Sequence, residues 1–321
     1  MPIITSHYHA PIWIANKHLQ TILPARFRIV KDVSYKRERI FTIDDDFIDL
    51  DWSFHDAKKL AIITYGVTGT SHSSYVLGMI KTLSHLGYDA LVWNYRNRIE
   101  PNKLRSITHG ASSEDLQRAI EHSYKCKSYQ ETVLIGFSLG GTIVLKYLGE
   151  KENNAHKYIS KAVTISAPCD LKSSIKEICK WKNFLYHRDC LNKIKDELLR
   201  KKGTYKNLMQ DIYLKNIYNV ENLTSQAIVP LNNFSDAEKY YQICNSKQYI
   251  PNISIPTLIL NAKNDPLLTN SNFPVKECED HKLVSLEMPK DGGHLGFMLK
   301  TINGLYYSEK RTAEFLNWTR Q

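Results

Sequence analysis

The chain contains six short apolar runs, and this series limits its fold more than any other feature. The runs are rich in Ile, Leu and Val and cover residues 60–65, 90–94, 132–135, 162–165, 257–260 and 283–288. Apolar runs of this length are typical of strands buried on both faces. Segments with helical spacing separate several of them, as when parallel strands alternate with helices. The pattern predicts an α/β fold with a mostly parallel central sheet and helices on both faces.

Two intervening segments carry apolar residues at intervals of three and four, the spacing of an amphipathic helix: Val76, Met79, Ile80 and Leu83, then Leu116, Ala119 and Ile120. Ser112 and Asp115 are placed as a capping box for the second helix. Residues 38–43 and 47–52 instead alternate apolar with polar side chains, and three aspartates separate them. That arrangement predicts a β-hairpin.

The pattern divides the chain into four parts. Residues 1–35 contain three prolines and are expected to form an irregular segment that packs on the core, with one or two helical turns at 18–23. Residues 36–167 and 251–321 supply the two parts of the core. Residues 168–250 lack a clear buried strand, but apolar residues recur there at helical spacing: Ile175, Ile178, Trp181, Leu185, Leu191, Ile194 and Leu198. We expect this insertion to form a helical cap.

Composition excludes several classes of protein. The 321 residues are 42% hydrophobic and 24% charged, which suits a globular chain with a full core. No stretch approaches the roughly 20 apolar residues of a membrane-spanning helix, and the N-terminus lacks the features of a secretory signal. Six scattered cysteines without a C-x-x-C pair are expected to be reduced thiols, so we predict a cytoplasmic protein.

The net charge of +10 raises the question of an acidic partner. Residues 171–250 contain fourteen Lys or Arg against eight Asp or Glu, so more than half of the excess lies in the insertion. No zinc-finger spacing, polybasic tail or aromatic RNA-binding signature accompanies it, so we expect no nucleic acid partner. The basic insertion suggests peripheral contact with an anionic membrane.

The segment Gly136-Phe137-Ser138-Leu139-Gly140-Gly141 lies between a predicted strand and a predicted helix. G-x-S-x-G in that context is the nucleophile elbow, in which a strained turn lifts the serine hydroxyl above the sheet. The small neighbours allow the tight turn, and the helix N-terminus points free N–H groups at the site. Ser138 is therefore the predicted nucleophile.

A serine nucleophile needs a base, and the base needs a carboxylate that orients it. Asp265 follows the predicted strand at 257–260, and His294 follows the one at 283–288 with glycines on both sides. The order Ser, acid, His is that of the α/β-hydrolases. Asp291 is the rival acid, but it would have to fold back onto its own loop. We predict Asp265 as the acid and His294 as the base.

Two main-chain N–H groups are expected to form an oxyanion hole. One belongs to Leu139, directly after the nucleophile. The other belongs to Val67, in the glycine-bearing loop after the first central strand. Histidines 7, 9 and 18 lack carboxylate or cysteine neighbours at metal-ligand spacing, so we predict no metal site.

These motifs resemble the YheT-like α/β-hydrolases, a family that includes plant embryogenesis-associated proteins and yeast medium-chain ester hydrolases and acyltransferases. The resemblance extends over nearly the whole chain, through HLQTILP at 18–24, DFIDLDW at 46–52, GVTG at 66–69, GFSLGG at 136–141, LKYLG at 145–149, APCDL at 167–171, DAEKYY at 236–241, NAKNDP at 261–266 and GGHLGF at 292–297. It implies an α/β-hydrolase fold, the same Ser138, Asp265 and His294, and esterase activity without a metal or organic cofactor.

Two positions depart from the family pattern. Relatives usually have His before the glycine of the oxyanion loop, where this chain has Tyr65. They also carry small residues after the Asn-Phe-Arg element, where this chain continues from Arg96 into the bulkier Asn97-Arg98-Ile99-Glu100. Tyr65 is expected to change how the oxyanion loop is held in place. The bulkier segment at 97–100 is expected to change substrate preference if it borders the acyl pocket.

Together these observations predict a serine hydrolase that cleaves short- to medium-chain acyl esters of small-molecule or lipid-like substrates through an acyl-enzyme. An acyltransferase or thioesterase would use the same triad, because an acyl-enzyme can pass its acyl group to acceptors other than water. A binding protein that kept the fold without turnover is an alternative of another class.

Overall fold

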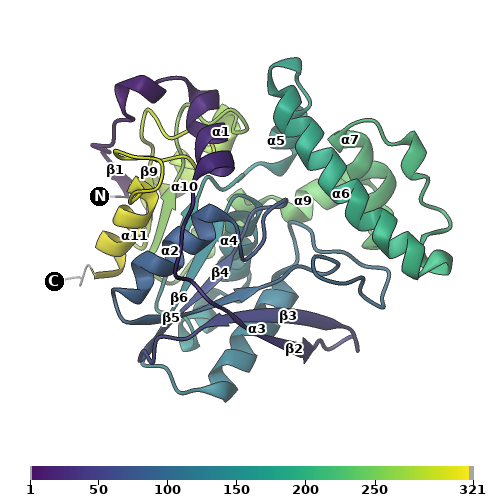
Figure 1. Ribbon diagram of the computed structural model, residues 1–321, viewed down its shortest axis with the longest axis horizontal. Helices are drawn as coiled ribbons and strands as arrows, with labels where there is room; N and C mark the ends of the chain where they lie inside the picture. The colour runs from purple at the N-terminus through teal and green to yellow at the C-terminus, as the bar shows by residue number, and fades with distance from the viewer. Residues whose placement is uncertain (1, 318–321) are drawn as a thin grey trace.

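The computed structural model describes residues 2–317, which form a nine-stranded sheet with helices on both faces (Figure 1). The strand order is β1-β9-β8-β7-β6-β4-β5-β3-β2. Neighbouring strands are parallel from β1 to β5 in this order, whereas β3 pairs antiparallel with both β5 and β2. The predicted fold class, with its mostly parallel sheet, is confirmed.

Six strands coincide with the predicted apolar runs: β4 (Lys59–Thr64), β5 (Tyr88–Trp93), β6 (Glu131–Phe137), β7 (Lys161–Ile165), β8 (Thr257–Leu260) and β9 (Val284–Glu287). The predicted hairpin is present as β2 (Lys36–Phe41) and β3 (Phe47–Ser53). β1 (Ile3–Ile4) adds a two-residue edge strand beside β9. Two residues give no periodic pattern, so the sequence did not predict β1.

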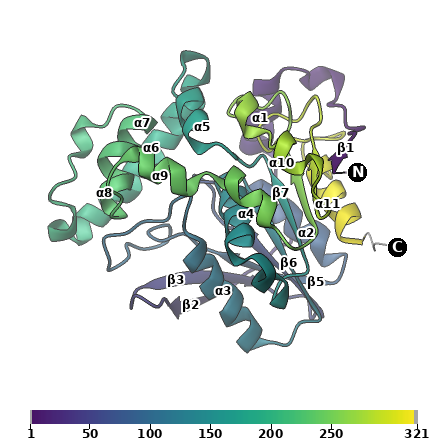
Figure 2. The same cartoon turned by 180° about the vertical axis from the view of Figure 1, so that it is seen from behind.

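Two groups of helices cover the two faces of the sheet (Figures 1 and 2). The first group is α1 (Lys17–Phe27), α2 (Ser74–Ser84) and α11 (Tyr307–Asn317). The second is α3 (Ser113–Cys126), α4 (Leu139–Lys151), α10 (Val275–Glu279) and the 3-10 segment η7 (Ser246–Asn252). The apolar residues that predicted α2 and α3 are buried, as their spacing requires.

The predicted capping box of α3 is wrong. Ser112 is the N-cap residue, but its side chain makes no capping hydrogen bond. Its Oγ instead accepts the N–H of His109 at 2.9 Å, and Asp115 pairs with Arg96 at 2.7 Å. Both side chains therefore stabilise the loop before the helix rather than the first turn of the helix.

The N-terminal segment is more regular than predicted. α1 spans eleven residues with Pro24 inside it. Proline removes one helix hydrogen bond, which is why the sequence indicated only one or two turns. Asn16 compensates at the start, where its side chain accepts the N–H groups of His18 and Leu19. Gln20 and Thr21 are buried and hold the helix against the core.

The residues between β7 and β8 are helical: α5 (Leu171–Ile178), α6 (Phe184–Thr204), α7 (Val220–Leu223), the π-helical turn η6 (Thr224–Ile228), α8 (Val229–Leu231) and α9 (Ala237–Cys244). Figure 1 shows α5, α6 and α7 (teal and green) standing together on one side of the molecule. The apolar periodicity breaks after α5, because a 3-10 turn separates it from α6. Trp181 and Leu185 are accordingly 90% and 64% exposed, whereas Ile175 and Ile194 are buried.

Within residues 2–317, no helix combines the length and the apolar character needed to cross a membrane. All six cysteines are free thiols, and Cys126 is exposed. The other five are buried or half-buried.

Candidate active site

Ser138 lies in a sharp turn between β6 and α4. Its φ is +51°, in the left-handed region that non-glycine residues rarely adopt. The turn needs glycine on both sides: a Cβ at Gly136 would lie 2.7 Å from the Gly141 Cα, and one at Gly140 only 2.2 Å from the Thr64 carbonyl oxygen. The Ser138 N–H donates to the Ile165 carbonyl at 2.9 Å, which fixes the turn to the end of β7.

The structure brings the three predicted triad residues together. Asp265 follows β8, and His294 lies in the loop between β9 and α11. The His294 Nε2 lies 2.9 Å from the Ser138 Oγ, and its Nδ1 lies 2.8 Å from the Asp265 Oδ2. The Asp265 Oδ1 accepts the N–H of Leu267 at 2.8 Å, which fixes the carboxylate plane. His294 therefore bridges a hydroxyl and a buried carboxylate.

Asp291, the rival acid, is placed differently. Its Oδ1 lies 3.4 Å from the Asn264 Nδ2, and no hydrogen bond joins it to His294 in the described part of the chain. Asn264 also accepts the N–H of Gly293 at 2.9 Å through its Oδ1. Asp291 thus belongs to the contacts around the histidine loop, and the geometry favours Asp265 as the partner of His294.

The two predicted oxyanion donors, Val67 and Leu139, both line the pocket next to Ser138. Leu139 is the first residue of α4, where a helix N–H has no partner within the helix. The loop of Val67 is held from several sides. The Gly66 N–H donates to the Tyr75 hydroxyl at 3.1 Å, and the Arg98 guanidinium donates to the Val67 carbonyl at 2.5 Å.

Helix α1 holds the histidine loop, a role that the sequence analysis did not assign. The Gly292 N–H donates to the Gln20 Oε1 at 2.7 Å, and the His294 N–H donates to the Thr21 Oγ1 at 2.9 Å. The fit is close, because a Cβ at Gly296 would lie 2.1 Å from the Gln20 carbonyl oxygen. The sequence signal for this support is the HLQT motif at 18–21, which contains both Gln20 and Thr21.

A pocket opens beside Ser138, with about 1070 Å³ of empty space including its mouth. Ser138, His294 and Leu139 lie on one side of it, and residues 95–98 and 107–109 border it. Apolar residues from the helices between β7 and β8 form most of the remaining wall, including Leu171, Ile175, Ile178, Ile194, Leu198, Val220 and Ile228.

One ion pair lies in this largely apolar wall. Arg98 pairs with Glu197 of α6 at 2.6 Å, and their side chains are only 8% and 14% exposed. Burial raises the pKa of Glu197, although the neighbouring guanidinium opposes that shift. Arg98 belongs to the segment that departs from the family pattern, so this departure does border the pocket. Because the same guanidinium also contacts the Val67 carbonyl, it links α6 to the oxyanion loop.

Ser138, Asp265 and His294 lie beyond the carboxyl ends of parallel strands. This arrangement defines the class of protein, since the fold is that of the α/β-hydrolases. The family model described as "Serine aminopeptidase, S33" matches residues 57–280. The chain belongs to this family.

Sequence relatives and solved structures agree with this assignment. The Escherichia coli protein YheT is 28% identical over 298 residues, which cover 90% of this chain and 86% of YheT. The human protein named phospholipase ABHD3 is 24% identical over 92% of this chain and 75% of its own length. The solved structure of the Pyrococcus furiosus esterase Pf2001 superposes with a TM-score of 0.58 at 18% identity, over 90% of this chain and 96% of that one.

Proposed function

We propose that this protein hydrolyses carboxylic esters through an acyl-enzyme formed on Ser138. The observation that carries the proposal is the position of His294 between the Ser138 hydroxyl and the Asp265 carboxylate, at the edge of a largely apolar pocket. The similar proteins support the same proposal, since they include a phospholipase and an esterase.

In the first half of the reaction, the Ser138 Oγ attacks the ester carbonyl carbon while the His294 Nε2 removes its proton. Asp265 holds the imidazole with Nδ1 protonated and stabilises the imidazolium that forms. The Val67 and Leu139 N–H groups hydrogen-bond to the oxyanion of the tetrahedral intermediate, and each such donor contributes about 10²–10³ in turnover. The intermediate collapses when His294 returns the proton to the leaving alcohol.

In the second half, water attacks the acyl-enzyme. His294 now removes a proton from that water and later returns it to the Ser138 oxygen, which leaves the free acid and the original enzyme. Another nucleophile in place of water would give acyl transfer on the same residues.

We further propose that residues 168–250 act as a cap and that their apolar side chains hold the acyl chain. The pocket wall from α5, α6 and α7 suits the hydrocarbon part of a lipid-like ester. We propose short- to medium-chain acyl esters as the substrates, and the chain-length series below tests this.

The test is hydrolysis of p-nitrophenyl esters from two to twelve acyl carbons by the wild type and by Ser138→Ala. We expect activity in the wild type only, with an optimum at short to medium length. Added alcohol measures the fraction of acyl transfer. Equal background rates for both proteins, together with no labelling of Ser138 by a fluorophosphonate probe, would refute the proposal.

We also propose peripheral contact with an anionic membrane. The start of α6 and the turn before it expose apolar side chains, with Trp181 at 90%, Phe184 at 56% and Leu185 at 64%. Lys180 and Lys182 lie among them and both pair with Glu177, so one net positive charge remains beside the apolar side chains. We expect cosedimentation with anionic vesicles that salt and Trp181→Ala each weaken, and little cosedimentation with neutral vesicles. Equal binding to both vesicle types would contradict a role for charge.

A further inference from the structure

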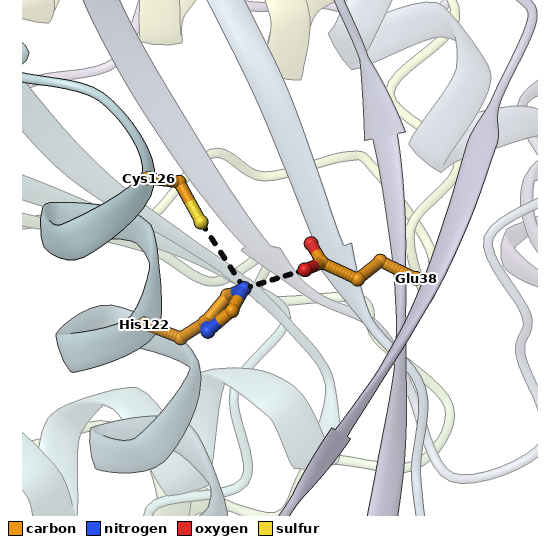
Figure 3. A group of neighbouring side chains, drawn as sticks. All are labelled: Glu38, His122 and Cys126. Atoms are coloured by element: carbon orange, nitrogen blue, oxygen red, sulfur yellow. Dashed lines mark hydrogen bonds and ion pairs between the residues drawn. The ribbon is translucent and has the colours of Figure 1, made fainter.

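A second cluster of reactive side chains lies outside the pocket, between the edge strand β2 and helix α3. It consists of Glu38, His122 and Cys126, whose ligand atoms all lie within 4.8 Å of one another. Figure 3 shows the Cys126 sulfur and a Glu38 carboxylate oxygen both directed at the same ring nitrogen of His122. The His122 Nε2 lies 3.0 Å from the Glu38 Oε1 and 3.1 Å from the Cys126 Sγ.

The backbone brings these residues together for simple reasons. His122 and Cys126 are four residues apart on α3, so they occupy the same face of the helix. Glu38 is in the middle of β2 and points toward that face (Figure 3). Its second oxygen, Oε2, accepts the indole N–H of Trp52 at 2.9 Å, which leaves Oε1 directed at His122. A hydrogen bond of this kind, behind a ligand, is a common feature of metal sites.

We propose that Glu38, His122 and Cys126 bind a borderline-soft divalent cation, with Zn²⁺ as the best fit. One nitrogen, one oxygen and one sulfur ligand suit Zn²⁺, whereas Mg²⁺ and Ca²⁺ prefer oxygen ligands alone. In a tetrahedral site, the nitrogen would lie about 3.3 Å from the oxygen and about 3.6 Å from the sulfur. The observed separations are a few tenths of an ångström shorter for both pairs, so small side-chain rotations suffice there.

The site would have three protein ligands and a fourth position open to water, because Cys126 is exposed and Glu38 is 40% exposed. A bound ion would cross-link β2 to α3 and so fasten the end of the sheet. The cluster shares no residue with the pocket, so metal binding and ester hydrolysis can be tested separately.

The experiment titrates the untagged full chain with Zn²⁺ in competition with a chromophoric chelator. We expect one ion per chain, and at least about tenfold weaker binding in both His122→Gln and Cys126→Ser. Cys179→Ser, which changes a cysteine elsewhere, and Ser138→Ala should bind Zn²⁺ as the wild type does. With Co²⁺, the wild type should show a thiolate charge-transfer band that Cys126→Ser lacks.

A wild type that binds Zn²⁺ no better than His122→Gln would overturn the proposal and leave the three side chains as hydrogen-bond partners only. Loss of binding in Cys179→Ser would also overturn it, by placing the ion elsewhere. His122, Cys126 and Cys179 are partly or fully exposed, and Ser138→Ala removes only a hydroxyl, so circular dichroism should confirm that each variant is folded.

Discussion

Tyr65 ties the start of the oxyanion loop to the segment that follows β5. Its hydroxyl accepts the N–H of Tyr95 at 2.9 Å, and the Tyr95 hydroxyl donates to the Tyr65 carbonyl. Burial raises the pKa of Tyr65, so its hydroxyl keeps its proton and remains a donor toward Asn94, 3.4 Å away. Tyrosine therefore braces the loop at the position where relatives usually have histidine.

Asp265 and Asp291 provide a matched pair of carboxylates for testing the proposed acid. Asp265→Asn should lower kcat about 10³–10⁴-fold, because the amide favours the wrong imidazole tautomer. Asp291→Asn should retain most of the activity, since Asp291 makes no hydrogen bond to His294 within the described residues. Steady-state kinetics on a p-nitrophenyl ester measure both, and the reverse ranking would assign the acid to Asp291.

At the scale of elements, α1 acts as a support for the histidine loop. Thr21→Val keeps the shape of the side chain but removes the acceptor of the His294 N–H. Without this anchor the His294 loop can shift, and because a misplaced catalytic group reduces turnover steeply, we expect kcat to fall about 10- to 100-fold. KM should change little because Thr21 does not line the pocket.

Thr21→Ser is the matched control, since it keeps the hydroxyl and should restore most of the activity. If the valine variant shows wild-type kcat, α1 does not position His294.

Helix α6 reaches the oxyanion loop through Arg98. The double variant Arg98→Met, Glu197→Gln removes both members of the ion pair, so no buried charge is left without a partner. It also removes the hydrogen bond from the Arg98 guanidinium to the Val67 carbonyl. We expect kcat to fall about 10- to 100-fold relative to Glu197→Gln alone, because a displaced catalytic group reduces turnover steeply. Arg105→Met, which removes the more exposed Arg105–Asp211 pair, should have little effect. Equal kcat in the double and single variants would exclude this link.

Patterns within a short stretch of sequence predicted those strands, helices and turns that have a characteristic order of apolar residues or glycines. The buried strands β4 to β9 and the helices α2 and α3 follow from apolar runs and spacing, and the strand–Ser138–helix turn follows from its glycines. Helix α1 was underestimated because Pro24 outweighed the capping by Asn16 and the burial of Gln20, which depends on a loop 272 residues away.

The triad residues could be proposed from the sequence because each follows a recognisable strand in a known order. The supporting contacts could not be proposed in the same way. Arg98 and Glu197 are 99 residues apart, and His122 and Glu38 are 84 apart, so only the folded chain pairs them. Nothing in the local sequence marks Trp52 as the residue that orients Glu38.

At the scale of the whole molecule, acid stability should depend on His109. Burial lowers its pKa to about 3, and its Nδ1 accepts the Ala111 N–H at 3.2 Å as a neutral ring. The unfolded chain, with a histidine pKa near 6.5, binds this proton first as the pH falls. Folding stability should therefore decrease from about pH 6.5 downward, by about 2 kcal/mol at pH 5 from this residue.

Urea unfolding at pH 7 and pH 5 measures this contribution. The wild type should lose about 2 kcal/mol more than His109→Gln between the two values, because glutamine does not titrate. Equal losses would show that His109 is protonated in the folded state.

The contact between α1 and His294 also has a consequence for the order in which the parts of the active site are synthesised. Thr21 and His294 are 273 residues apart, so the ribosome makes the helix long before the loop that it holds. At roughly 5–20 residues per second, that interval takes about 14–55 s. Ser138 precedes His294 by 156 residues, and a growing chain therefore presents its serine without a base. The nascent protein would be unable to attack esters until His294 has been made and its loop has folded against the triad.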